Sequence, residues 1–181
     1  MNILKIKEIT RVELKNKLQN YLDEFGKFCS ENSVYVNGID IDHICYKCSS
    51  KEEYEIIRCF FEYDDIFIYQ SIFSKRRISI IRFLDPLKSI CGDVHCLELS
   101  DQKPDGSQGS KVDHIEPVPK TISYEEMLGR FSKLELPIEE NIKPHHSTHY
   151  IVLPNGIKLK FNNEPLIPKI YRDEMVIKNN L

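Results

Sequence analysis

The stretch CLELSDQKPDGSQGSKVDHIEPV, residues 96–118, joins two apolar runs through a loop rich in glycine, proline and serine. Glu98 lies at the end of the first run, and His114 lies near the start of the second. An earlier run, IDIDHICYK at 39–47, carries the same Asp-His-Ile triplet around His43. Because breaker-rich stretches separate structural units, the loop predicts a boundary between two modules, each of which begins with an Asp-His-Ile strand.

The first part of the chain predicts a helix followed by a strand, a second helix and further strands. Apolar residues recur at helical spacing over 10–31, after a capping box that begins at Thr10. Alternation predicts a strand over 39–47, and a capping box at Ser50 opens a helix to about residue 61. Three strand-like runs follow, at 65–73, 76–84 and 93–100. The Asp-Pro pair at Pro86 is expected to end the second of these runs.

Beyond the loop at 101–111, the same order of elements restarts. Residues 112–118 predict a strand, and a third capping box at Ser123 opens a helix to about residue 134. The runs HSTHYIVL and IKLKFN flank Asn155-Gly156, and Asn-Gly between apolar runs is the strongest short signal for a hairpin. The sequence therefore predicts an α+β fold in which both modules run from a strand through a helix to further strands.

Composition limits the class of protein and its partners. The chain of 181 residues is 41% hydrophobic and 29% charged, which is typical of a globular protein, and its net charge is -3. This charge argues against nucleic acid as a partner, because phosphate binding needs a basic surface. No apolar run approaches the roughly 20 residues that span a bilayer. The N-terminus has no signal-peptide core, so we expect a cytoplasmic protein without a membrane segment.

The six cysteines are expected to be reduced in that compartment. Cys45 and Cys48 form a CxxC pair, but residues three apart in a strand point to opposite faces. No second CxxC completes a zinc site. We therefore interpret these cysteines as small buried hydrophobic residues rather than as a redox or metal motif.

The intervals between the polar residues support the repeat. His43 and Glu98 are 55 residues apart, and His114 and Asn162 are 48 apart. Each interval runs from the first strand of a module to its last strand. If both modules curl their sheets around a shared cleft, these strands can aim one side chain each at the same point.

This order of motifs resembles the vicinal oxygen chelate superfamily, which includes glyoxalase I and the ring-cleaving dioxygenases. More narrowly, the chain resembles the bacterial YecM family of metal-binding proteins. The similarity extends from about residue 10 to residue 170. The matching stretches are DHICYKC at 42–48, LELSDQKPDG at 97–106, VDHIEPVP at 112–119 and HSTHYIVLPNGIKLKF at 146–161.

The resemblance implies two βαβββ modules that form a cupped mixed sheet, with a divalent metal ion in the cup. We expect three parts along the chain. They are an N-terminal helical extension at 1–35, a single domain at 36–163 with modules at 36–100 and 111–163, and a C-terminal tail at 164–181.

The resemblance also implies metal ligands. His43, Glu98 and His114 fall where the superfamily places two histidines and a carboxylate, a set that suits Zn²⁺, Fe²⁺, Ni²⁺ or Mn²⁺ and leaves positions open for water and substrate. The fourth place falls near Asn162, whose neutral oxygen is a weak ligand and departs from the family pattern. Two alternatives stay open. Glu164 has the same strand parity but precedes a proline, and His149 could line the cup.

Other charged residues near these positions have two interpretations. Arg82 could hold an anionic substrate, or it could be an edge-strand charge that discourages pairing with other chains. Asp42 and Asp113 have the opposite strand parity to the histidines, so we expect them not to be ligands. An isolated histidine in a strand is more often a partly buried residue with ordinary partners than a ligand. The case for a site therefore rests on the whole set.

Two classes of function are compatible with these residues. The first is a metal-dependent enzyme that acts on a small molecule with vicinal oxygens, with Glu116 as the general base because it shares a strand face with His114. The second is a non-catalytic protein that binds a metal or a small molecule, as the departure at Asn162 suggests. The substrate, the reaction and the oligomeric state do not follow from the sequence.

Overall fold

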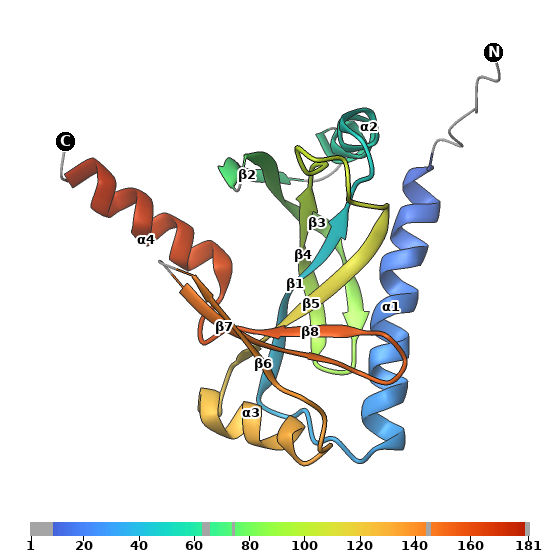
Figure 1. Cartoon of the computed structure of the whole chain (residues 1–181), viewed down its shortest axis with the longest axis vertical. Helices are drawn as coiled ribbons and strands as arrows, with labels where there is room; N and C mark the ends of the chain where they lie inside the picture. Colours follow the sequence, from blue (N-terminus) through green and yellow to red (C-terminus); the bar gives the residue numbers. More distant parts are fainter. Residues whose placement is uncertain (1–8, 63–65, 74, 144–145, 180–181) are drawn as a thin grey trace.

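The computed structural model describes residues 9–62, 66–73, 75–143 and 146–179. Two βαβββ units follow an N-terminal helix, α1 (Arg11–Glu31), and precede a C-terminal helix, α4 (Leu166–Asn179) (Figure 1). The first unit consists of β1 (Ile39–Lys47), α2 (Lys51–Glu62), β2 (Ile66–Phe73), β3 (Arg76–Ser89) and β4 (Gly92–Ser100). The second consists of β5 (Lys111–Pro119), α3 (Tyr124–Ser132), β6 (Glu139–Lys143), β7 (His146–Val152) and β8 (Lys158–Phe161).

All eight strands form one mixed sheet in the order β2-β3-β4-β1-β5-β8-β7-β6. In each unit the first and last strands pair in parallel, β1 with β4 and β5 with β8, and the remaining pairs are antiparallel. The two units meet where β1 and β5 pair in an antiparallel manner. The predicted α+β fold with two βαβββ modules is therefore confirmed, and its centre is the β4-β1-β5-β8 group of strands.

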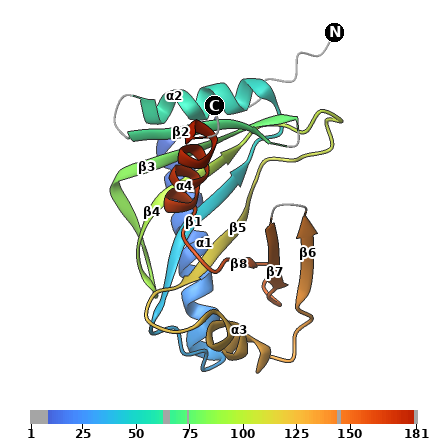
Figure 2. The same ribbon diagram turned by 90° about the vertical axis from the view of Figure 1, so that its left-hand side faces the viewer.

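The sheet has an apolar outer face that the first three helices cover. The capping box predicted at Thr10 is present, and from there α1 buries Leu14, Leu18, Leu22 and Phe25. It packs mainly against β3 and β5. Aromatic contacts join α2 and α3 to the same face, from Phe61 to Phe83 and from Phe131 to Phe161. Figures 1 and 2 show α1 on one side of the sheet and α4 on the other.

The inner face carries the polar residues, because side chains alternate between faces along each strand. On β1 this face holds His43 and Cys45, and on β4 it holds Cys96 and Glu98, while Ile44 lies in the core on the outer side. The alternation seen in the sequence therefore separates an apolar layer under the helices from a polar layer opposite them.

Three elements differ from expectation. Asp85-Pro86 does not end β3, which continues to Ser89, because the pairing with β4 shifts register between Arg82 and Leu87 and then resumes. A proline is tolerated at such an irregularity because it needs no ladder hydrogen bond there. Neither β6 nor α4 was predicted. Pro168 obscured α4, although a proline is compatible with the first turn of a helix.

The division into an extension, a domain and a tail stays a proposal. Among the described residues, no helix is long and apolar enough to cross a membrane.

Candidate metal centre

The polar residues of the inner face form two rows across the three central strands. Strand pairing places Cys96, His43 and Glu116 side by side in one row. It places Glu98, Cys45 and His114 side by side in the next. The two histidines and two glutamates therefore occupy diagonal positions of a small patch at the junction of the modules.

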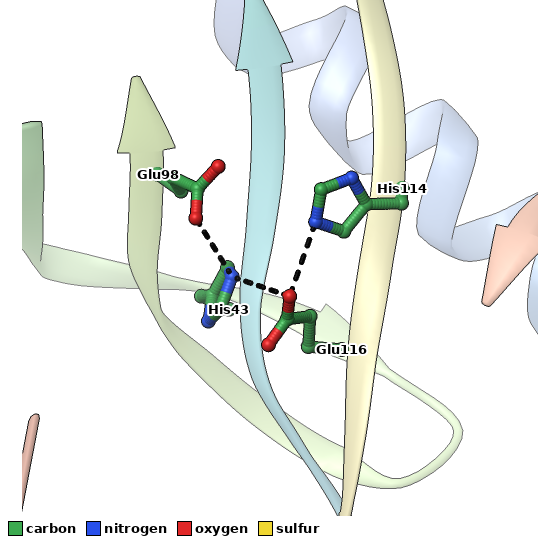
Figure 3. Close-up of side chains that lie close together, drawn as sticks. All are labelled: His43, Glu98, His114 and Glu116. Atoms are coloured by element: carbon green, nitrogen blue, oxygen red, sulfur yellow. Dashed lines mark ion pairs between the residues drawn. The ribbon is translucent and has the colours of Figure 1, made fainter. Parts of the chain in front are cut away.

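Their side chains converge (Figure 3). One potential ligand atom from each of His43, Glu98, His114 and Glu116 lies within 4.8 Å of the others. The His43 Nε2 atom is 3.6 Å from Glu98 Oε2 and 3.6 Å from Glu116 Oε1. The His114 Nε2 atom is 3.3 Å from the same Glu116 oxygen. Two metal–nitrogen bonds of about 2.1 Å allow donors up to roughly 4.2 Å apart, so small side-chain adjustments would suffice for one shared ion.

Each histidine is held by the aspartate that precedes it. The Asp42 Oδ2 atom lies 2.8 Å from His43 Nδ1, and Asp113 Oδ2 lies 2.9 Å from His114 Nδ1. A neutral imidazole that donates Nδ1–H to a carboxylate presents the lone pair of Nε2 on its other side. The unit repeated in the sequence is therefore a carboxylate together with the imidazole that it orients.

Two β-bulges put these aspartates in place. In the β1–β5 ladder, Ile41 pairs with Pro117 and His43 pairs with Glu116, so Asp42 is an extra residue in β1. Further along, Cys45 pairs with His114 and Tyr46 pairs with Val112, so Asp113 is an extra residue in β5. A bulge re-aims side chains locally. Strand parity places the aspartates opposite to the histidines, and it missed that the bulges bring them to the imidazoles. That neither aspartate is a metal ligand stays a prediction.

The Nε2 atoms of both histidines are buried, and neither has a hydrogen-bond partner among the described residues. The nearby carboxylate oxygens lie at 3.3–3.6 Å, too far or too poorly aligned for hydrogen bonds. Buried polar atoms are nearly always paired, because an unpaired one costs roughly 1–3 kcal/mol. Two such atoms that both lie near Glu116, one of them also near Glu98, fit the donors of a metal site.

The charges of the site are strongly coupled. Burial alone would lower the pKa of His43, but Glu116, Asp42 and Glu98 together raise it well above its ordinary value of 6.5. Burial alone would raise the pKa of Glu98, but the two histidines and Lys160 lower it to about 2. Without a metal ion, the surrounding carboxylates therefore favour the protonated form of His43.

The second glutamate is held at both of its oxygens. Lys160 Nζ pairs with Glu116 Oε1, and the side-chain amide of Asn162 donates to Glu116 Oε2. Glu116 is only 1% exposed. Although burial would raise the pKa of Glu116, His43 and Lys160 keep it well below its ordinary value.

A sequence model of the family described as YecM protein matches residues 10–165. The chain belongs to the YecM family. None of the curated proteins matches it. This outcome confirms the narrower of the two resemblances stated from the sequence motifs.

Solved structures support the fold of this YecM-family chain. The match to a structure described as "Structural Genomics, Protein EC4020" covers 90% of this chain and 92% of that structure's chain, with 16% identity and a TM-score of 0.71. The match to the Streptomyces coelicolor methylmalonyl-CoA epimerase covers 70% of this chain and 97% of the epimerase chain, with 14% identity and a TM-score of 0.46. The match to fosfomycin resistance protein FosX from Listeria monocytogenes covers 72% of this chain and 97% of the FosX chain, with 12% identity and a TM-score of 0.29. The first of these structures shows the fold of the chain.

The internal repeat of this YecM-family chain identifies a residue that sequence reasoning missed. Ile44 pairs with Leu97 in the first module, and Ile115 pairs with Leu159 in the second. The residue equivalent to Glu98 is therefore Lys160, not Asn162, which lies two positions further along. The second module thus carries a cation where the first has its carboxylate, and Glu116 approaches from β5 instead.

The two alternative fourth ligands lie elsewhere. The suggestion that His149 lines the cup is wrong, because its Nδ1 atom lies 2.9 Å from the Tyr124 hydroxyl of α3 on the outer face. Glu164 pairs with Arg172 at 2.6 Å and is not in a group of possible metal-holding residues within the described ranges.

Two further predictions concern residues around the centre. Cys45 and Cys48 are buried free thiols, as expected, but Cys45 also donates a hydrogen bond of 3.2 Å to Glu98. Burial and the Glu98 charge raise the pKa of Cys45, which favours a thiol over a thiolate. Arg82 is exposed and pairs across β3 and β4 with Cys96, so it borders the inner face. Both interpretations of Arg82 stay open.

Proposed function

We propose that the chain is a divalent-metal-binding protein of the vicinal oxygen chelate type, with His43, Glu98 and His114 as ligands and Glu116 as the fourth. The observation that carries this proposal is the pair of buried, unpartnered Nε2 atoms aimed at two carboxylates. Two imidazoles and two carboxylates suit Zn²⁺, Fe²⁺, Ni²⁺ or Mn²⁺.

Glu116 fits the fourth position better than Asn162 does. Its carboxylate lies within 3.6 Å of both Nε2 atoms, whereas the amide of Asn162 contacts the far oxygen of Glu116. An ionised carboxylate is also a stronger ligand than a neutral amide oxygen. In this arrangement Asn162 orients Glu116 rather than replacing it.

The proposed ligand is a small molecule with vicinal oxygens, on which the protein acts as a metal-dependent enzyme. A bound divalent cation would polarise a carbonyl or stabilise the negative charge of an enediolate. Asp42 and Asp113 would hold the two imidazoles in an orientation that directs the Nε2 lone pairs at the ion. Glu116 stays the candidate general base, in the event that substrate displaces it from the ion.

One observation favours the second candidate, a non-catalytic binding protein on the same fold. Lys160 and Asn162 occupy both oxygens of Glu116, which hinders the transfer of a proton to that carboxylate. Turnover assays of the metal-loaded protein with methylglyoxal–thiol adducts, catechols and hydroxy-keto acids separate the two candidates. That the chain has no partners other than small molecules stays a prediction, and so does its cytoplasmic location.

Elemental analysis tests the metal site directly. We expect protein purified without added metal or chelator to contain about one equivalent of a divalent transition metal, because two oriented imidazoles and two carboxylates bind such ions tightly. Mass spectrometry of the elements measures the content. After chelator treatment, one equivalent should rebind. A protein that neither retains nor rebinds metal would contradict the proposal.

Metal affinity should fall as the pH is lowered. The metal binds deprotonated His43, and the raised pKa of that residue means that a proton must be displaced even above its ordinary value of 6.5. Each displaced proton makes the apparent affinity fall about tenfold per pH unit. Competition titrations against a chelating dye between about pH 8.5 and pH 6 measure this slope. A flat profile over the range would show that no histidine proton is displaced.

A further inference from the structure

The surroundings of the metal centre contain matched charges before any metal binds. Four carboxylates lie in or beside it, and four lysines accompany them from β1, β5 and β8. The carboxylates are Asp42, Glu98, Asp113 and Glu116, and the lysines are Lys47, Lys111, Lys158 and Lys160. With both imidazoles neutral, a divalent cation leaves this group with a surplus of two positive charges.

Three of the four lysines are paired. Lys47 and Lys111 both contact Asp113, at 2.6 and 3.0 Å, and Lys160 contacts Glu116. Lys158 makes no ion pair with any carboxylate of the described residues. Its ammonium group lies 4.0 Å from the centre of the Tyr150 ring, which positions the charge without neutralising it.

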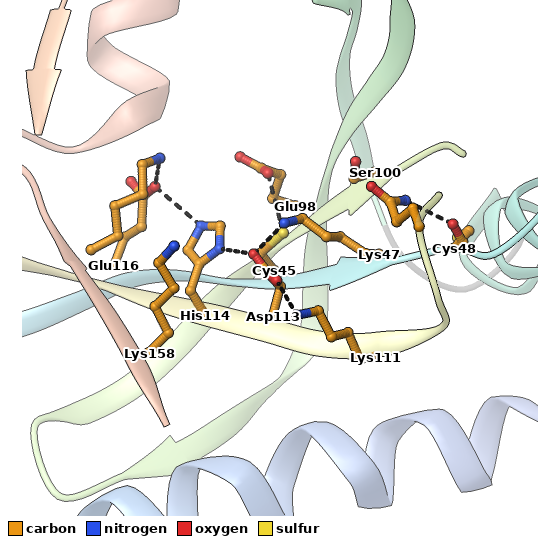
Figure 4. Close-up of polar contacts among 12 residues, drawn as sticks. Cys45, Lys47, Cys48, Glu98, Ser100, Lys111, Asp113, His114, Glu116 and Lys158 are labelled. Atoms are coloured by element: carbon orange, nitrogen blue, oxygen red, sulfur yellow. Dashed lines mark hydrogen bonds and ion pairs between the residues drawn. The ribbon is translucent and has the colours of Figure 1, made fainter. Parts of the chain in front are cut away.

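Lys158 lies next to the centre rather than on a remote surface. It is two residues before Lys160 on β8, so the two side chains share the inner face. Figure 4 shows it beside His114 and Glu116. Burial lowers the pKa of Lys158; Asp113 opposes this shift, whereas the three neighbouring lysines add to it. An anion placed there would relieve the repulsion between the lysines.

We propose that the small-molecule ligand carries two anionic groups: a chelating hydroxy- or keto-carboxylate end for the metal and a second group, such as a phosphate, that Lys158 binds. This inference rests on the proposed metal site and names the class of ligand that the site takes. The second anion replaces the missing carboxylate partner of Lys158 and, together with the chelating carboxylate, offsets the surplus positive charge. A charge-assisted contact of this kind contributes about 10–100-fold in affinity.

Calorimetric titration of Ni²⁺-loaded protein with two probes tests the inference. D-glycerate has the chelating end alone, and 3-phospho-D-glycerate has the same end with a phosphate on the third carbon. We expect the phosphorylated probe to bind at least about tenfold more tightly to the wild-type protein. Lys158→Gln should abolish most of that difference, and Lys158→Arg should keep it because the charge remains.

Lys133→Gln is the matched control, since Lys133 is an exposed lysine at the end of α3 and should leave both affinities unchanged. Equal binding of the two probes by the wild-type protein would overturn the inference, as would an undiminished difference in Lys158→Gln. Stoichiometric Ni²⁺ together with either result would leave the metal site intact and remove only the anionic ligand. Failure to bind Ni²⁺ at all would remove both.

Discussion

Replacement of His43 or His114 by alanine is expected to abolish stoichiometric metal binding. Loss of residues that only orient a metal ligand typically weakens affinity about 10–100-fold, and removal of a ligand itself should cost more than that. The two histidines supply the only two imidazole donors that converge with Glu98 and Glu116 in the described part of the chain. Elemental analysis of each purified variant and a competition titration measure the loss.

His95→Ala is the matched control, because His95 lies on β4, three residues before Glu98, but is exposed. It should keep one equivalent of metal at wild-type affinity. Asp42→Asn provides a milder test, since the imidazole remains while its carboxylate partner is lost; we expect about 10–100-fold weaker binding. One equivalent of metal held at unchanged affinity by His43→Ala would refute the assignment of that ligand.

Replacement of Lys160 by methionine is expected to destabilise the metal-free protein by about 2–4 kcal/mol. Removing one partner of a buried ion pair leaves an uncompensated charge and typically costs about 3–5 kcal/mol. The side chain of Lys160 is 21% exposed and that of Glu116 is 2% exposed, and Asn162 also contacts Glu116, so we expect a loss that is about 1 kcal/mol smaller than that range. Chemical denaturation of the chelated protein measures the free energy of unfolding.

The metal should reverse part of this loss, because a bound cation supplies the charge that Lys160 supplied. The control is Lys120→Met, which removes an exposed ion pair with Asp40 and should change stability by less than about 1 kcal/mol. If Lys160→Met and Lys120→Met had equal effects on the metal-free protein, the buried pair would not contribute as argued.

The sequence predicts much of the fold because its two strongest signals are local. Alternation around His43 and His114 defines β1 and β5, and Asn155-Gly156 defines the β7–β8 hairpin. Parity also places Glu116 on the face of His114. Strand parity cannot show whether Glu116 is a general base or a metal ligand, because that depends on distances across β1 and β5.

The fourth position shows where counting along the chain fails. The interval from His43 to Glu98 is longer than the equivalent interval from His114 to Lys160, because the connections between the strands differ in length in the two modules. Only the pairing of Ile115 with Leu159 shows that Lys160, and not Asn162, matches Glu98. The aspartates were missed for a related reason: a bulge breaks the alternation that a strand pattern assumes.

The bulges at Asp42 and Asp113 behave like a pair of opposite dislocations. One adds a residue to β1 and the other adds a residue to β5, so the ladder has the same alignment before the first bulge and after the second. Only residues 43–45 of β1 and 114–116 of β5 are displaced by one position, and this short window holds both histidines and Glu116. Neither dislocation can disappear alone without sliding one end of the ladder and turning its side chains to the wrong face. The two ends of the β1–β5 ladder thus hold the residues between the bulges in place. The metal-ligating side chains on these two strands therefore stay aligned without a metal ion.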